Sequence, residues 1–166
     1  LLGRDDPIRE GLRGTPDRVA RALMEMTSGY GQDAASILHT DFGVERYDEM
    51  VVLRGFEFHS LCEHHLLSFW GTAPVAYVPD GRVVGLSKLA RLVDCYARRL
   101  QLQERLTQQV ADALAEHLHP RGYGVLLRGT HLCMIARGVR KAQAEMVTTA
   151  LGGALINAKK HFVRRY

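Results

Sequence analysis

The chain of 166 residues contains only three cysteines and one tryptophan, and it has no long apolar run. An odd number of cysteines argues against a disulfide framework and leaves metal binding, catalysis or simple burial as their roles. No apolar stretch approaches the roughly 20 residues that a membrane-spanning helix needs. Residues 1–6 lack the order of charge, apolar stretch and cleavage site of a secretory signal. We therefore expect a cytoplasmic protein with no membrane partner.

The net charge is also small, +4, because 22 Lys and Arg are nearly balanced by 18 Asp and Glu. This modest basic excess suits an anionic ligand, either nucleic acid or a phosphorylated small molecule. The basic pairs at 98–99 and 164–165 have no interleaved platform of aromatic side chains on which bases would stack. We interpret these pairs as solvated faces or subunit contacts, and we expect no nucleic-acid partner.

The first part of the sequence, residues 1–47, carries helix signals and is expected to form a helical N-terminal extension. Thr15 can cap a helix, Pro16 suits its first turn, and Asp17 complements the positive end of the helix dipole. A shorter helix is expected over residues 33–38. Beyond this segment the apolar periodicity changes from that of helices to that of strands.

The rest of the chain, residues 48–166, is expected to form one domain with elements in the order ββααββ. Strands are predicted over residues 50–58, 69–78, 125–134 and 146–150. One helix is expected to begin at Ser87, acting as its cap, a second at about Gln103, and a third at the C-terminus. This order predicts an α+β fold, an antiparallel four-stranded sheet with two helices on one face. Because both sheet edges would be unpaired, we expect oligomerisation.

A candidate metal site begins with the short pattern Cys62-x-x-His65. Zinc binds thiolates and neutral imidazoles in a tetrahedral arrangement, and a catalytic zinc keeps one position open. Cys133 is the candidate third ligand, and His131 would share its face on the strand predicted there, since side chains alternate across a sheet. The pattern alone is short, and buried cysteines with unrelated histidines fit it more often.

Five separated blocks, in one order along the chain, closely resemble the GTP cyclohydrolase I family. They are CEHHLL at 62–67, GLSKLAR at 85–91, QERLT at 103–107, HLC at 131–133 and ARGVR at 136–140. The resemblance extends over nearly everything between Thr15 and Leu155. It implies the tunnelling fold, assembled as a homodecamer of two face-to-face pentamers, with a β-barrel and with active sites between subunits.

The resemblance implies a zinc-dependent hydrolase that acts on GTP. Cys62, His65 and Cys133 would hold Zn²⁺, which activates a water to attack C8 of guanine. His131 would protonate N7 as the imidazole ring opens. His64 would assist beside the metal or serve as a hydrogen-bonding neighbour of its ligands. Formate would leave, and rearrangement to 7,8-dihydroneopterin triphosphate would complete the first step of tetrahydrofolate or biopterin synthesis, a part of one-carbon metabolism.

The resemblance also assigns the base. Glu104 would anchor guanine, because one carboxylate can accept hydrogen bonds from both N1 and the exocyclic N2, and Gln103 would support the same edge. Judged by its position alone, Glu104 is a first-turn carboxylate favoured by the helix dipole.

The phosphates are assigned in the same way. Lys88 and Arg91 stand three apart on the first turn of a helix and would form one half of a clamp. Arg137 of the basic loop would add a contact, and Arg18 would come from a neighbouring subunit. The hydroxyl of Ser87 would aid the later rearrangement near the phosphates or ribose, a role that competes with capping.

Three positions depart from the family pattern without removing a functional group: Ser68, Arg128 and Pro74. Two other functions remain open. A reductase of the same fold would attack a deazapurine nitrile with a nucleophilic cysteine, which two metal-binding cysteines disfavour. A non-catalytic zinc- or nucleotide-binding subunit would carry a closed site of four ligands, whereas three are present. Cys95 is interpreted as a packing residue.

Overall fold

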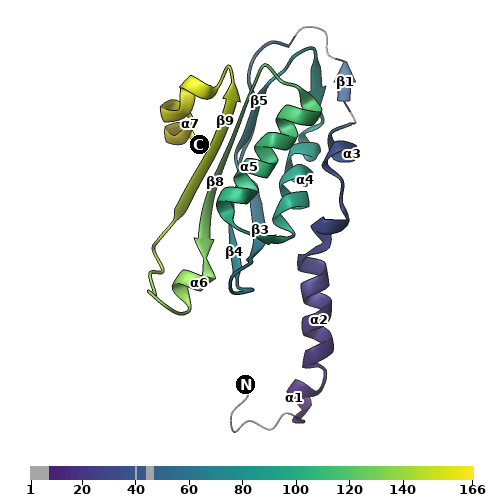
Figure 1. The fold of residues 1–166 in the computed structure, drawn as a ribbon, viewed down its shortest axis with the longest axis vertical. Coiled ribbons are helices and arrows are strands. Elements are labelled where there is room, and N and C mark those ends of the chain that lie inside the picture. Colours follow the sequence, from purple (N-terminus) through teal and green to yellow (C-terminus); the bar gives the residue numbers. More distant parts are fainter. Residues whose placement is uncertain (1–7, 40, 44–46) are drawn as a thin grey trace.

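The computed structural model describes residues 8–39, 41–43 and 47–166, with residues 41–43 described by their backbone (Figure 1). Its N-terminal part contains α1 (Glu10–Arg13), α2 (Thr15–Met26), a 3₁₀ turn (Ser28–Gly31) and α3 (Ala34–Leu38). The short helix predicted at 33–38 is confirmed, and the Asp33 carboxylate caps it by accepting from the backbone of Ala35 and Ser36.

The expected cap at Thr15 is wrong. Gly14 holds the cap position of α2, and Thr15 is already the first helical residue. The reason is that α1 ends at Arg13, directly before Gly14. The Thr15 hydroxyl therefore turns back and donates to the carbonyl of Gly11 at 3.3 Å. The helix ends at Met26.

Helix α2 projects from the body of the molecule and buries none of its residues (Figure 1). Its apolar residues Val19 and Met24 are 50% and 67% exposed. Gly29 joins this segment to the body, where its backbone N–H donates to the carbonyl of Arg98 at 2.9 Å. A Cβ at this glycine would lie 2.4 Å from the Cys95 carbonyl oxygen. The close approach therefore requires glycine.

The predicted strand order is confirmed, although the first two strands are each broken. The first consists of β2 (Val51–Leu53) and β3 (Glu57–Cys62), separated by a turn with Gly55 at a φ of 79°. The second consists of β4 (Ser68–Thr72) and β5 (Val75–Val78), separated at Pro74, which cannot donate to a ladder. Central β8 (Gly122–His131) pairs with both β4 and β5 on one side and with β9 (Met146–Gly153) on the other.

Three short strands were not predicted. β1 (Asp41–Gly43) pairs with β6 (Arg82–Val84), and β7 (Leu100–Gln101) runs parallel to the end of β3. The last pairing matters for the site, because it places Gln101 beside Cys62.

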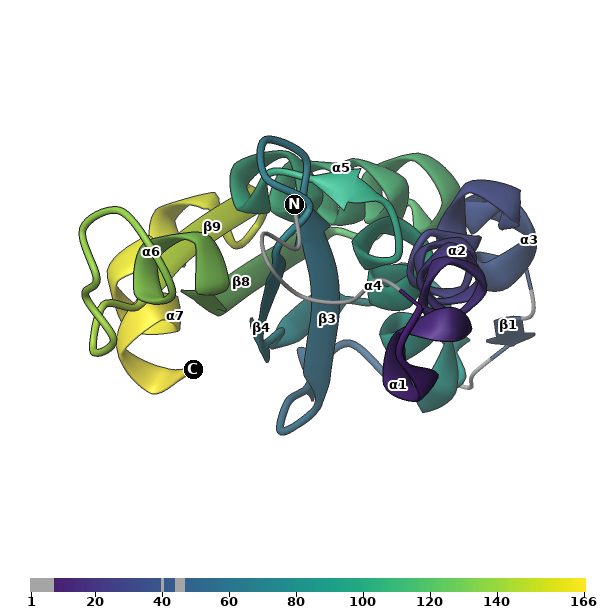
Figure 2. The same ribbon diagram turned by 90° about the horizontal axis from the view of Figure 1, so that it is seen from below.

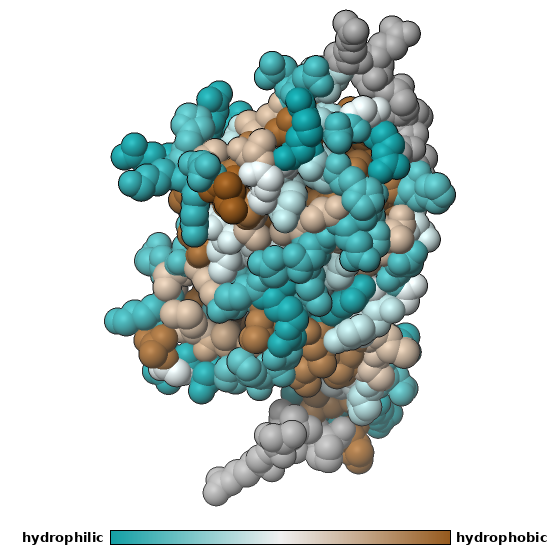
Figure 3. Space-filling model, turned by 45° about the horizontal axis from the view of Figure 1, so that its top comes forward, coloured by the Kyte–Doolittle hydropathy of each residue, from teal (hydrophilic) through white to brown (hydrophobic). Residues whose placement is uncertain are grey.

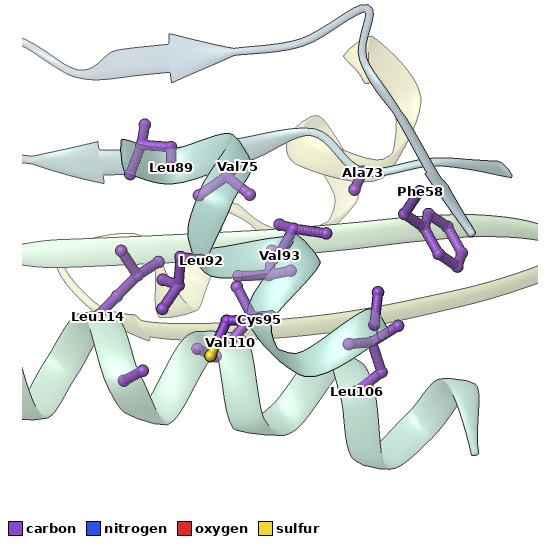
Figure 4. Close-up of a cluster of buried hydrophobic side chains, with 14 of the residues drawn as sticks. Phe58, Ala73, Val75, Leu89, Leu92, Val93, Cys95, Leu106, Val110 and Leu114 are labelled. Atoms are coloured by element: carbon purple, nitrogen blue, oxygen red, sulfur yellow. The ribbon is translucent and has the colours of Figure 1, made fainter. Parts of the chain in front are cut away.

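The two expected helices, α4 (Leu86–Ala97) and α5 (Gln103–Ala113), cover one face of the sheet (Figures 1 and 2). Figure 4 shows part of the core between these helices and the sheet, a cluster of buried side chains that includes Val75 of β5, Leu92 of α4 and Val110 of α5. Because side chains alternate along a strand, Ala76 and Leu126 face the other side. There they pack against Phe162. The C-terminal helix α7 (Lys159–Arg165), preceded by a 3₁₀ turn (Ile156–Ala158), thus covers the second face.

Two further local expectations are corrected. Gly85, and not Ser87, holds the cap position of α4, so Ser87 is the second residue of the helix. Cys133 does not lie on a strand, because β8 ends at His131 and Leu132–Ile135 forms the short helix α6. The pairing of β8 ends here on both sides, since its last partner in β4 is Phe69, opposite His131, and its last partner in β9 is Met146, opposite Gly129. Without partners the chain turns into a helix.

Arg128, one of the departures from the family pattern, ties α7 to the sheet. Its guanidinium donates to the carbonyls of Val163 and Tyr166 at 3.2 and 3.4 Å and pairs with Glu145 at 3.1 Å. Figure 3 shows a largely hydrophilic face with hydrophobic side chains gathered mainly in its lower part. Within the described part of the chain, no helix has the length and apolar character needed to cross a membrane.

Candidate metal centre and active site

The turn between β3 and β4 brings Cys62 and His65 together. The backbone N–H groups of His65 and Leu66 both donate to the carbonyl of Cys62, at 3.3 and 2.8 Å. Leu66 adopts a positive φ of 53°, which folds the chain back. As a result, the Sγ of Cys62 lies 3.6 Å from the Nδ1 of His65. A tetrahedral zinc would hold a sulfur and a nitrogen ligand about 3.6 Å apart.

Cys133 reaches the same point from the first turn of α6. The candidate ligand atoms of Cys62, His65 and Cys133 all lie within 4.8 Å of one another, the only such group among the residues that the structure describes. Two thiolates and one imidazole are a donor set that zinc prefers, and three ligands leave a fourth position open. The residues therefore fit zinc, although Cys133 reaches the site from a helix and not from the predicted strand.

The thiol of Cys133 has a raised pKa, first because of its burial and then because of the neighbouring Cys62. A bound dication reverses such an effect, since it favours the thiolate. Arg137 lies beside the same group. Its Nη1 is 3.4 Å from the carbonyl of Cys133 and 3.5 Å from the Nε2 of His65. A predicted phosphate ligand thus lies next to the predicted metal ligands.

His131, the last residue of β8, is held by two contacts. Its ring stacks on Phe69 with centroids 4.6 Å apart and the planes within 3° of parallel. Its Nε2 lies 2.9 Å from the Oε1 of Gln103, the first residue of α5. Burial lowers the pKa of His131, and the negative charge of Glu104 partly opposes this shift. The neutral imidazole is favoured as a consequence.

Glu104 and Gln103 are adjacent but point in different directions. Glu104 is exposed and lines a hollow of about 380 Å³ between α5 and β9, together with Thr148 and Lys159. Gln103 is 1% exposed. Its Nε2 donates to the carbonyls of Leu127 and Met146 at 3.2 and 2.9 Å. A direct contact between this amide and a base would require breaking one of these hydrogen bonds.

His64 is exposed on the β3–β4 turn, with its ring 6.1 Å from that of His65 and perpendicular to it. Between the two ligand positions, Glu63 forms a bidentate ion pair with Arg105 of α5, one of whose bonds is 3.0 Å long. This pair lowers the pKa of Glu63. The sequence prediction missed Arg105, although it directly follows Glu104 in the QERLT block.

The remaining predicted site residues lie elsewhere in the chain. Lys88 and Arg91 line a hollow of about 550 Å³ between α4 and α3. Ser87 is exposed on the first turn of α4, which lies at the opposite end of the sheet from the β3–β4 turn (Figure 1). Arg18 lies on the projecting α2, where its guanidinium donates to the carbonyl of Gly11 at 2.8 Å. One chain therefore brings together the candidate metal ligands, His131 and Glu104, but not these four residues.

Comparison with known proteins gives a consistent result. A family described as GTP cyclohydrolase I matches residues 2–165. A protein of Chlorobium phaeovibrioides named GTP cyclohydrolase 1 is 52% identical over 155 residues, which are 93% of this chain and 70% of that protein. One of Nitrosospira multiformis with the same name is 55% identical over 152 residues, 91% of this chain and 80% of its own. One of Deinococcus radiodurans is 52% identical over 149 residues, 90% and 69%.

Among solved structures, the chain is similar to the archaeosine synthase QueF-Like in its apo form. The TM-score is 0.53 at 21% identity, covering 66% of this chain and 98% of that one. At this identity the likeness concerns the fold alone, and it supports the expected tunnelling-type arrangement of the sheet and its two helices.

Proposed function

The chain belongs to the GTP cyclohydrolase I family, and on that premise we propose that it converts GTP into formate and 7,8-dihydroneopterin triphosphate. This reaction would be the first step of tetrahydrofolate or biopterin synthesis. The observation that carries the proposal is the convergence of Cys62, His65 and Cys133 within 4.8 Å, beside a histidine held at the end of β8.

These three residues would hold Zn²⁺. Zinc, when bound, lowers the pKa of a bound water, so that the nucleophile hydroxide is available near neutral pH. Both bonds from C8 to the ring nitrogens must break before formate can leave, and each nitrogen then needs a proton. His131 would deliver the proton to N7, since its ring is fixed by Phe69 and Gln103. His64, exposed beside the ligands, would assist proton transfer or orient the ribose.

Glu104 would select the base. Its carboxylate is exposed at the first turn of α5, and it can accept from the N1 and N2 donors of guanine together. Adenine offers no such pair of donors. Glu104 directly follows Gln103, whose Oε1 lies 2.9 Å from the His131 ring, so a base held by Glu104 would lie near His131.

The triphosphate would be held by Lys88, Arg91, Arg137 and Arg18, with Ser87 near the phosphates or ribose. Arg137 alone of these lies beside the metal ligands within one chain. Helix α4 has 12 residues and spans about 18 Å. Lys88 and Arg91 lie near its beginning, whereas its end is followed by β7, whose Gln101 pairs with Cys62. We therefore propose that Lys88, Arg91, Ser87 and Arg18 act on a site of another copy, in a homo-oligomer such as the expected decamer.

The proposal is tested by metal analysis combined with a GTP-dependent formate assay. The expected result is about one zinc per chain and formation of formate together with a pterin that fluoresces after oxidation. A protein that holds zinc and releases no formate would be the non-catalytic subunit. A protein without zinc that reduces a deazapurine nitrile would be the reductase.

A further inference from the structure

The amide of Gln103 has only one possible orientation. Its Nε2 faces the carbonyls of Leu127 and Met146 at 3.2 and 2.9 Å, and carbonyl oxygens can only accept. The hydroxyl of Thr148 lies 3.1 Å from the same nitrogen. Exchanging the amide nitrogen and oxygen would set oxygen against two carbonyls. The Oε1 of Gln103 must therefore be the atom that faces His131.

This orientation determines the state of the His131 ring. The Oε1 of Gln103 lies 2.9 Å from Nε2 and can only accept, so Nε2 must carry a hydrogen. No hydrogen bond to the Nδ1 of His131 occurs within the described part of the chain. Phe69 covers one face of the ring at 4.6 Å. The contacts thus fix both the plane of the ring and the nitrogen that faces the protein interior.

Gly129 makes room for this arrangement. It lies two residues before His131 on β8, and a Cβ built at this position would be 2.1 Å from the Oε1 of Gln103. Any larger residue would push the amide away from its place. The strand, the helix and the histidine therefore form one built unit.

Resting on the proposed function, we propose that Gln103 is a positioning residue that holds His131 in the Nε2–H tautomer, with Nδ1 directed at the substrate. Because the amide does not titrate, it imposes one tautomer in the resting enzyme. In this tautomer Nδ1 carries no hydrogen, so it would first take a proton from the attacking water, as the water oxygen bonds to C8, and would then pass that proton to N7. Its role is to act through the histidine and not to contact the base.

The tautomer can be measured in the zinc-loaded full chain by magic-angle-spinning NMR after labelling the eight histidines with ¹³C and ¹⁵N. His131 is assigned by the signal that disappears in His131→Asn. We expect the shifts of the Nε2–H form. An Nδ1–H form in the unaltered protein would overturn the proposal.

Gln103→Leu removes the acceptor. We expect both tautomers of His131 to be populated and kcat for GTP to fall by roughly 10- to 100-fold, with KM within about threefold because the base and phosphate contacts remain. Retention of the Nε2–H form alone, whatever happens to kcat, would overturn the proposal. If Gln103→Leu does not fold, Gly129→Ala displaces the same oxygen and is expected to give the same two changes.

Gln109→Leu is the matched control. It makes the same substitution on the same helix, where Gln109 accepts from the side chain of Gln101 at 2.7 Å. We expect an unchanged His131 tautomer and kcat within about twofold. The NMR result does not depend on turnover. An unaltered protein that releases no formate from GTP would overturn the proposed function and leave the tautomer assignment intact, whereas an active protein with the Nδ1–H form would overturn this inference alone.

Discussion

The two ends of the sheet differ in how complete they are. At the end formed by the β3–β4 turn, α6 and the start of α5, one chain brings together three metal-ligand candidates, His131 and Glu104. At the other end, Lys88 and Arg91 line a separate hollow against α3. The difference teaches that the groups proposed for bond breaking are assembled by folding alone. Of the cations proposed for the triphosphate, only Arg137 lies at the end with the candidate metal ligands, and the proposal assigns Lys88, Arg91 and Arg18 to a second copy.

The largest effect is expected from Cys133→Ala, which removes one ligand of the complete end. Zinc content should fall from about one per chain to a small fraction, because two ligands hold zinc weakly. Formate release should fall to background. The measurements are metal analysis and the formate assay on the same sample. Full zinc occupancy in this variant would mean that Cys133 is not a ligand.

His131→Ala is expected to keep the metal and lose turnover. The ring has no role among the proposed ligands, so zinc content should equal that of the unaltered protein, while kcat falls by roughly 10²- to 10⁴-fold. Metal analysis and steady-state kinetics test this together. Loss of zinc in this variant would mean that His131 is needed for metal binding and not only for proton transfer.

Glu104→Gln is expected to lower kcat/KM for GTP by about 100-fold, because the amide can accept from only one of the two guanine donors and loses the charge. Inosine triphosphate lacks the exocyclic amino group and serves as the control substrate. Its kcat/KM should fall less, so that the preference for GTP shrinks. An unchanged preference would place the base elsewhere.

Arg91→Ala tests the incomplete end and is expected to raise KM for GTP by roughly tenfold. Mixing it with inactive His131→Ala chains, after dissociation and reassembly, sharpens the comparison. If each site takes His131 from one copy and Arg91 from another, about a quarter of the sites in an equal, random mixture should contain both intact residues and show full activity. Mixtures with no more activity than the sum of the separate variants would contradict sites shared between copies.

The smallest effect is expected from Arg105→Met. The pKa of Glu63 is lowered by its hydrogen bond to Arg105, so the ion pair stabilises the fold above the ordinary carboxyl pKa and loses this effect as the pH falls through the lowered value. The Tm difference between variant and unaltered protein should be small at neutral pH and vanish in acid. A difference that persists in acid would point to lost packing of the Arg105 side chain.

Most of the framework followed from local pattern. The order ββααββ, the helix capped by Asp33 and the break at Pro74 each depend on residues close together in sequence. Where the prediction failed, neighbouring elements decided. Cys133 lies on a helix because the pairing of β8 with the strands beside it ends before this residue. Gly14, and not Thr15, caps α2 because α1 ends directly before it.

Within the candidate site, the three candidate metal ligands were predicted from sequence, and the structure brings them together. The contact between Gln103 and His131, 28 residues apart, was not foreseen. One signal in the sequence could have revealed it. Gln103 lies on the same helical face as Leu106 and Val110, so the pattern predicts that its polar side chain is buried and needs a hydrogen-bonding partner. The separation of Lys88 from the metal end depends on tertiary geometry and has no local signal.

The first turn of α5 serves two purposes at once. Gln103 points into the protein and Glu104 points out, since neighbours on a helix are rotated by about 100°. The helix is rigidly packed through Leu106 and Val110. Under the proposed roles of Glu104 and His131, any shift of α5 along or around its axis would therefore change base selectivity and proton delivery together. If Glu104 selects the base as proposed, a change of purine specificity requires a substitution at Glu104 that leaves the position of α5 unchanged.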